Sequence, residues 1–143
     1  MKQWIFLLLI IISCSKMTQQ PIDVISVRTA TPQEIKENSL PVTSNMVVTI
    51  SSDEDFETIN PKMSFGFVAV RNWEDYQLPQ EELATKHLIF DVVDLKKTEP
   101  KQYQFFIDAS LLIPHTSVFC RLERPGFVST PGYKSEIFEL KFK

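Results

Sequence analysis

The segment Asn72-Trp73-Glu74-Asp75-Tyr76 holds the residue types in this chain that are best suited to recognition chemistry. Two aromatic side chains flank two carboxylates directly after an expected strand. Aromatic faces stack on the C–H groups of sugars and carboxylates accept hydrogen bonds from sugar hydroxyls, so Trp73, Asp75 and Tyr76 are candidate glycan contacts. The same residues suit a protein interface, where Trp and Tyr are enriched. The structural alternative, which is favoured, is that Trp73 folds back over the core edge and Tyr76 caps the sandwich.

Groups suited to catalysis are few. The two histidines, His87 and His115, stand apart from any metal-binding spacing such as H-E-x-x-H. The chain has no G-x-S-x-G elbow, and its three glycines are too few for a phosphate-binding loop. A Ser-His-Asp arrangement stays open, because its members are far apart in a chain. The sequence predicts a protein that is not an enzyme and that uses no cofactor.

The acidic segment 53–57, Asp-Glu-Asp-Phe-Glu, offers several carboxylate oxygens of the kind that calcium prefers. It lacks the D-x-[DN]-x-[DN]-G spacing and the central glycine that turns ligands inward. The favoured interpretation is a solvated turn whose charge keeps a sheet edge from pairing. No metal site is predicted.

Cys120 alternates with Val118 and Leu122, which form an apolar face. A nucleophilic cysteine needs a positive, partly exposed setting and a histidine partner. Cys120 is therefore expected to be buried as a small hydrophobic residue.

Short segments rich in β-branched and aromatic residues must position these groups. In the last of them Phe138 and Leu140 point one way and Glu139 and Lys141 the other, the period of two of a half-buried strand. Strands are expected at residues 22–29, 46–50, 63–70, 88–95, 103–109, 116–122 and 137–142. Six or seven strands with short turns are typical of an all-β fold, here a single antiparallel β-sandwich.

Helix signals are few. Thr31-Pro32-Gln33-Glu34 combines an N-cap threonine, a proline at the first helical position and a glutamate placed to close a capping box. Pro41 limits this helix to two turns. Segment 78–86 is expected to hold one helical turn in a crossover loop.

The first residues of the chain differ in composition from the rest. A nine-residue apolar run, Trp4 to Ile12, follows Lys2 and leads to Ser13-Cys14. A membrane-spanning helix needs roughly 17–25 apolar residues, whereas this run has the length of a signal-peptide core. It resembles a bacterial lipoprotein signal. An ordinary secretory signal is disfavoured, because its cleavage site needs a small residue where this chain has Ile11.

The lipoprotein resemblance implies cleavage before Cys14, with acyl chains such as palmitate on its thiol and on the new amino terminus. Each buried methylene contributes about 0.8 kcal/mol, so several chains hold a protein at a membrane effectively for good. Cys120 then remains as the lone thiol, and no disulfide within the chain is expected. The chain divides into a signal peptide (1–13), a lipidated tether (14–21) and one β-sandwich domain (22–143).

The residues around Leu112 carry a more specific motif. Leu112-x-Pro114-x-Thr116, followed by the alternating Val118 and Cys120, is similar to the L-x-P-x-T-x-Y corner of the fibronectin type III family. In that family the leucine fills the core, Pro and Thr shape the turn, and the tyrosine hydroxyl bonds back to the chain. The tyrosine position falls on Val118 here, so that hydroxyl is missing.

Two further segments are similar to fibronectin-like domains of Bacteroidetes lipoproteins. They are Gly66-Phe67-Val68 and the stretch 132–138, Gly-Tyr-Lys-Ser-Glu-Ile-Phe. The resemblance covers about residues 42–143 and implies a fibronectin-like or immunoglobulin-like sandwich. A transthyretin-like sandwich, as in some secretion-system lipoproteins, is the alternative.

The charge of the chain and the residues that follow Cys14 limit the partners and the locations to be expected. The net charge of −3 and the lack of a clustered basic face disfavour nucleic acid as a partner. Ser15 stands where some lipoproteins carry the aspartate that retains them in the inner membrane, so the outer membrane is expected. Lys16 and Met17 lack the acidic run of surface-export signals, which favours the periplasmic side over the cell surface.

The predicted function is that of a lipid-anchored, non-enzymatic interaction or structural accessory of an envelope assembly, with an envelope protein as its partner. Glycan binding through Trp73, Asp75 and Tyr76 is the alternative.

Overall fold

The computed structural model describes residues 19–41, 45–59, 64–108, 110, 117–126 and 131–141. Within these ranges the strands are β1 (Gln19–Thr29), β2 (Asn45–Ser51), β3 (Ser64–Val70), β4 (His87–Asp94), β5 (Lys96–Glu99), β6 (Gln102–Asp108), β7 (Ser117–Arg124), β8 (Gly132–Ser135) and β9 (Phe138–Lys141). The helices are α2 (Pro32–Glu37), α3 (Phe56–Ile59), α4 (Gln80–Lys86) and the 3-10 helix η1 (Trp73–Gln77).

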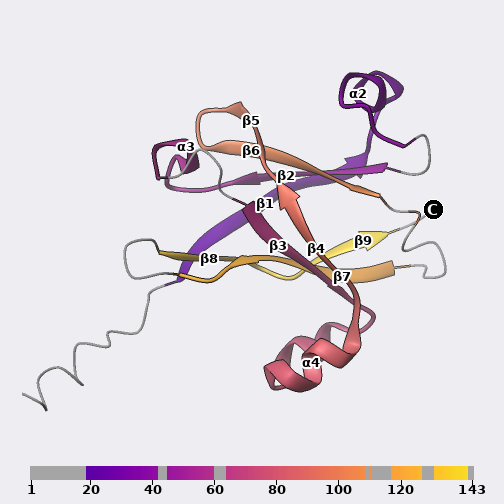
Figure 1. Ribbon diagram of the computed structural model, residues 1–143, viewed down its shortest axis with the longest axis vertical. Coiled ribbons are helices and arrows are strands. Elements are labelled where there is room, and N and C mark those ends of the chain that lie inside the picture. Colours follow the sequence, from indigo (N-terminus) through magenta and orange to yellow (C-terminus); the bar gives the residue numbers. More distant parts are fainter. Residues whose placement is uncertain are drawn as a thin grey trace, which may run out of the picture.

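The strands form two layers that share β1 (Figure 1). Hydrogen-bonded neighbours follow the order β4-β3-β7-β8-β1-β2-β6-β5, with β9 beside β7. The first part of β1, 19–22, pairs in parallel with β8, and the rest pairs antiparallel with β2. The layers β1-β2-β6-β5 and β4-β3-β7-β8 have the strand order of an immunoglobulin sandwich. The predicted all-β sandwich is therefore confirmed.

Two details of the predicted sandwich are wrong. The described residues form nine strands rather than six or seven, and the pair β1–β8 is parallel rather than antiparallel. The sequence pattern misses β5 and β8, which are four residues long. β5 is Lys-Lys-Thr-Glu and β8 is Gly-Tyr-Lys-Ser, so neither has the alternating apolar residues that indicate a strand.

The hydrophobic core lies between the two layers. Phe65 and Phe67 of β3 face inward, and the ring of Phe67 lies 6.0 Å from that of Phe105 on β6 in the opposite layer. On the other side of β3, Val68 and Val70 form a smaller cluster with Leu83 of α4. Figure 1 shows α4 outside the layer that contains β3 and β7. Successive residues of β3 therefore alternate between the core and the outer face of its layer.

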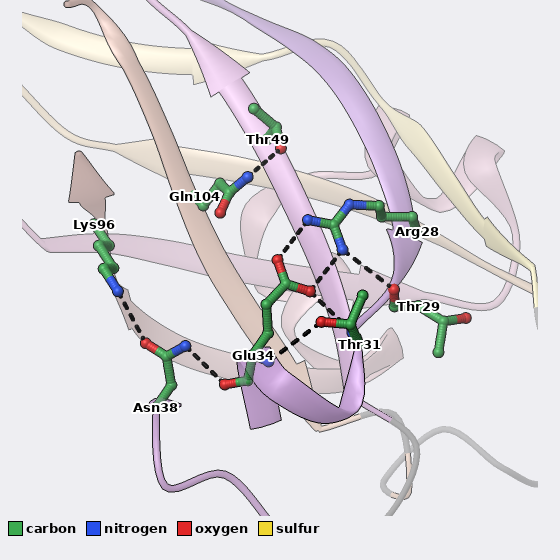
Figure 2. A network of polar contacts seen from close by, with 8 residues as sticks. All are labelled: Arg28, Thr29, Thr31, Glu34, Asn38, Thr49, Lys96 and Gln104. Atoms are coloured by element: carbon green, nitrogen blue, oxygen red, sulfur yellow. Dashed lines mark hydrogen bonds and ion pairs between the residues drawn. The ribbon is translucent and has the colours of Figure 1, made fainter. Parts of the chain in front are cut away.

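The start of α2 follows its sequence signal (Figure 2). The Glu34 N–H donates to Thr31 Oγ1 at 3.2 Å, and the Thr31 N–H donates to Glu34 Oε2 at 2.9 Å. These two bonds are the predicted capping box. Both Nη atoms of Arg28 on β1 also contact the Glu34 carboxylate, at 2.6 and 2.8 Å. On the other side of the helix, Lys96 donates to Asn38 at 3.3 Å, which ties α2 to β5.

Glu34 makes the stability of this corner depend on pH. The hydrogen bonds from Arg28 and from the Thr31 backbone lower the pKa of Glu34 to about 2. A carboxylate whose pKa is lower in the folded state stabilises the fold above its unfolded pKa, and this contribution disappears as pH falls through the folded pKa.

We expect the Glu34→Gln variant to lose part of the acid sensitivity of the fold. The free energy of unfolding should decline between about pH 5 and pH 2 in the wild type, and less in the variant. Because the ion pair is solvent-exposed, the difference should stay within about 1 kcal/mol. Urea denaturation at pH 7 and pH 3 measures it, and identical declines would contradict the role given to Glu34.

Candidate functional site

The loop between β3 and β4 carries the three contact residues predicted from the sequence, and it forms η1. Trp73 is 46% exposed, while Asp75 and Tyr76 are half-buried. The Tyr76 hydroxyl lies within hydrogen-bond distance of two backbone carbonyl oxygens, 2.8 Å from that of Val68 and 3.0 Å from that of Phe119. Burial raises the pKa of this hydroxyl. Tyr76 therefore caps β3 and β7, and Trp73 is exposed to solvent.

The ring of Tyr76 is also covered by a charged side chain. The guanidinium carbon of Arg121 lies 4.5 Å from the ring centroid, a cation–π geometry. Arg121 is held in place by Glu123, with Nη2 and Oε2 2.9 Å apart. The two aromatic residues of this loop thus do not form one sugar-binding platform, because one points inward and the other outward.

The acidic segment is tied to the end of the sandwich. The Tyr133 hydroxyl donates to Glu54, and the Tyr103 hydroxyl donates to Asp55 at 2.8 Å. Lys97 pairs with Asp55 at 2.8 Å and holds the pKa of this carboxyl below its usual range. The carboxylates of Glu54 and Asp55 are therefore engaged within the fold, and no group of three metal-ligating side chains occurs in the described part of the chain.

Phe56 of α3 anchors this segment. Its ring lies 4.7 Å from that of Tyr103, 5.0 Å from that of Tyr133 and 5.2 Å from that of Phe65. Its N–H also donates to the Tyr103 hydroxyl at 2.8 Å. An aromatic cluster between the layers thus fixes the position of the acidic loop.

The other side chains that could take part in chemistry are Cys120 and the histidines. Cys120 is fully buried and its thiol is free, and burial raises its pKa, so the predicted role as a buried hydrophobic residue is confirmed. His87 stacks on Phe90, with ring centroids 5.8 Å apart.

Three of the sequence predictions lie outside the described residues: the lipidation site Cys14, the corner motif around Leu112, and His115. No helix that the structure describes is long and apolar enough to cross a bilayer.

The most exposed apolar surface was not singled out by the sequence. Phe90 and Val92 of β4 are 60% and 59% exposed. They pair with Val68 and Gly66 of β3, on the face of that layer that points away from the core. α4 and η1 cover Val68 on this face, whereas Gly66 has no side chain to cover it.

A groove of about 270 Å³ lies over Gly66. We call it the Gly66 groove; its lining includes Phe65, Gly66, Phe90, Val92, Glu123 and Pro125. A Cβ added to Gly66 would meet the Phe90 ring at 3.7 Å and the Glu123 carbonyl at 3.4 Å, so the missing side chain opens the groove. Its volume is below the roughly 300–1,000 Å³ of small-molecule pockets. It therefore suits one or two apolar side chains of a partner.

Two buried polar atoms lie close to this surface without a hydrogen-bond partner in the described ranges. They are Nε2 of His87, at the start of β4, and Nη1 of Arg124, whose residue lines the Gly66 groove. Buried polar atoms are nearly always bonded in native proteins.

The sequence of β4 contains a pattern from which this apolar surface could have been predicted. The β4 sequence HLIFDVVD has apolar residues on both faces, which is typical of a strand buried on both sides. In the fold, β4 is the last strand of its layer, so the outer face with Phe90 and Val92 stays uncovered.

We expect Gly66→Ala to narrow the groove without disturbing the fold. The added Cβ makes only ordinary contacts, and alanine loses less backbone entropy than glycine, so the free energy of unfolding should rise by up to about 0.5–1 kcal/mol. Gly132→Ala is the matched control, since its Cβ would lie 2.9 Å from the backbone nitrogen of Gly126 and force a shift. Thermal unfolding compares them; equal destabilisation would show that the space over Gly66 is already filled.

The fold and the site define an all-β sandwich with an open apolar groove on one outer face. Comparisons of the chain with family models, with curated proteins and with solved structures give no match. The proposal for its function therefore rests on its own residues.

Proposed function

We propose that this chain is a lipid-anchored protein of the bacterial outer membrane, facing the periplasm, that acts as a non-enzymatic interaction accessory of an envelope assembly. The anchor is supported by the lipoprotein-like sequence that ends at Cys14. The contact surface is the outer face of β3 and β4, and its partner is an envelope protein.

The observation that carries the interaction role is the exposure of Phe90 and Val92 beside the Gly66 groove. Single exposed apolar residues are common on protein surfaces and need no explanation. Here two large ones are neighbours on one strand and border a groove of side-chain size. A few residues in well-packed, desolvated pockets supply most of the binding energy at interfaces.

Site-specific photo-cross-linking in cells tests this proposal. A photoreactive amino acid replaces Val92 in the full-length chain, and mass spectrometry identifies what it captures. We expect one envelope protein, at near-stoichiometric yield. The control position is Ile25 of β1, which is 50% exposed but lies away from the groove, and it should give no adduct with the same protein. Equal capture from both positions, or none from Val92, would argue against the role of this face.

Glycan binding remains the second candidate because Trp73 is 46% exposed beside the half-buried Asp75. The Trp73→Ala variant separates the two functions. The glycan role would be favoured over the protein contact by two results together. The wild type is retained on immobilised envelope glycan and the Trp73→Ala variant is not, and the photoreactive residue at position 92 captures no protein.

A further inference from the structure

The open edge of β4 offers backbone groups as well as side chains. β4 ends the strand order of its layer, so one of its edges has no neighbouring strand among the residues that the structure describes. The Val92 N–H donates to the carboxylate of Asp91 at 2.8 Å, a bond expected of an amide on the open edge. Outward amides alternate in an antiparallel ladder, so Phe90 presents its own to the same edge.

The side chains of the same two residues stand on the outer face of the layer. A strand that joins β4 would place every second side chain beside Phe90 and Val92, because directly opposite residues lie about 4.5–5.5 Å apart. The side chains of the added strand that lie beside Phe90 and Val92 must be apolar, because they have to remove these two exposed side chains from water. The side chains between them would lie on the other face, next to Asp91, which is exposed.

Charge decides what kind of strand fits. β4 carries the exposed carboxylates of Asp91 and Asp94 and no lysine or arginine. A second copy of this chain, paired through its own β4, would bring four carboxylates onto one short ladder, and like charges facing each other across strands are destabilising. Asp91 lies on the face of β4 opposite to Phe90 and Val92, whereas Asp94 shares the face of those two residues. A segment with basic residues between its apolar ones would place a positive charge beside Asp91 instead.

We propose that β4 is extended by an added strand, a segment of the partner protein in which apolar and basic residues alternate. This inference rests on the proposed interaction function and names the partner chemistry of that site. Asp91 has two roles in it. In the free chain its carboxylate covers the Val92 N–H and so protects the open edge. In the complex a partner carbonyl accepts that N–H, and Asp91 pairs with the basic residue opposite it.

Peptide binding to the full-length lipidated chain in detergent micelles tests this proposal. The probe is a fluorescein-labelled nine-residue peptide of alternating valine and lysine. Two comparison peptides are an alternating valine–glutamate peptide and one of the same valine–lysine composition with the lysines grouped together. We expect the alternating lysine peptide to bind at least about tenfold more tightly than either, by fluorescence anisotropy. Hydrogen exchange should slow at the Phe90 and Val92 amides.

Three variants assign the contacts. Phe90→Ser should weaken binding about tenfold, whereas Ile25→Ser, at an apolar position on β1 that is 50% exposed, should not change it. The Asp91→Ala variant should lose the preference for lysine over glutamate, while its circular dichroism stays native. Equal binding of the three peptides, or a Phe90→Ser variant that binds normally, would overturn the proposal.

The outcomes also separate this inference from the proposed function. A specific cross-link from Val92 without any peptide preference would overturn strand addition and leave the interaction role in place. Failure of both experiments would overturn both. If the free chain is a dimer that Phe90→Ser dissociates, the strand beside β4 comes from a second copy and the partner chemistry proposed here is wrong.

Discussion

Replacement of Phe56 by alanine is expected to lower the free energy of unfolding by about 3–5 kcal/mol. Phe56 is 2% exposed, and its ring contacts those of Tyr103, Tyr133 and Phe65. The cavity removes the burial energy and also the aromatic pair interactions, which add about 0.5–1.5 kcal/mol each. α3 has four residues and cannot hold itself in place, so the acidic segment should also lose its fixed position.

The matched control is the same substitution on the outer face. Phe90 is 60% exposed, so Phe90→Ala should change the free energy of unfolding by no more than about 0.5 kcal/mol. Urea denaturation of both variants at pH 7 measures the difference. Comparable losses in the two variants would mean that Phe90 is part of a packed core and would remove the basis of the proposed interaction surface.

Replacement of Cys14 by serine is expected to move the chain from the membrane fraction to the soluble fraction. Serine cannot accept the lipid through a thioether, and each lost methylene removes about 0.8 kcal/mol of membrane affinity. Incorporation of labelled palmitate and fractionation after an alkaline wash measure the change. Cys120→Ala is the control, because Cys120 is fully buried, and it should keep both the label and the membrane location. Labelling lost in the control but kept in Cys14→Ser would refute the anchor.

Local sequence patterns predicted the parts of the fold that local chemistry controls. The period of two at residues 138–141 identified which side of β9 faces the core. Phe138 and Leu140 pack in the core, whereas Glu139 and Lys141 form an ion pair with each other. The capping box at Thr31 located the start of α2, because its two hydrogen bonds join residues three positions apart. In both cases the determining contacts lie on neighbouring residues or on one face of one strand.

Features that depend on distant residues were not predictable in this way. Trp73 and Tyr76 are three positions apart, yet one is exposed and the other is bonded to Val68 on β3 and Phe119 on β7. Nothing in the composition of that loop indicates which aromatic turns inward. The exposure of Phe90 likewise follows from the place of β4 at the end of its layer, and strand order is a property of the whole chain.

The pairing of β1 with β8 has a consequence for how the domain is completed. Gln19 is paired with Gly132, so the first strand needs a partner from near the other end of the chain. Synthesis delivers a chain from its amino terminus. The segment 19–22 must therefore wait, with only the later part of β1 held by β2, until the residues of β8 emerge. A nascent chain halted before Gly132 keeps an unpaired strand end, and its exposure to chaperones and proteases lasts until the final strands arrive.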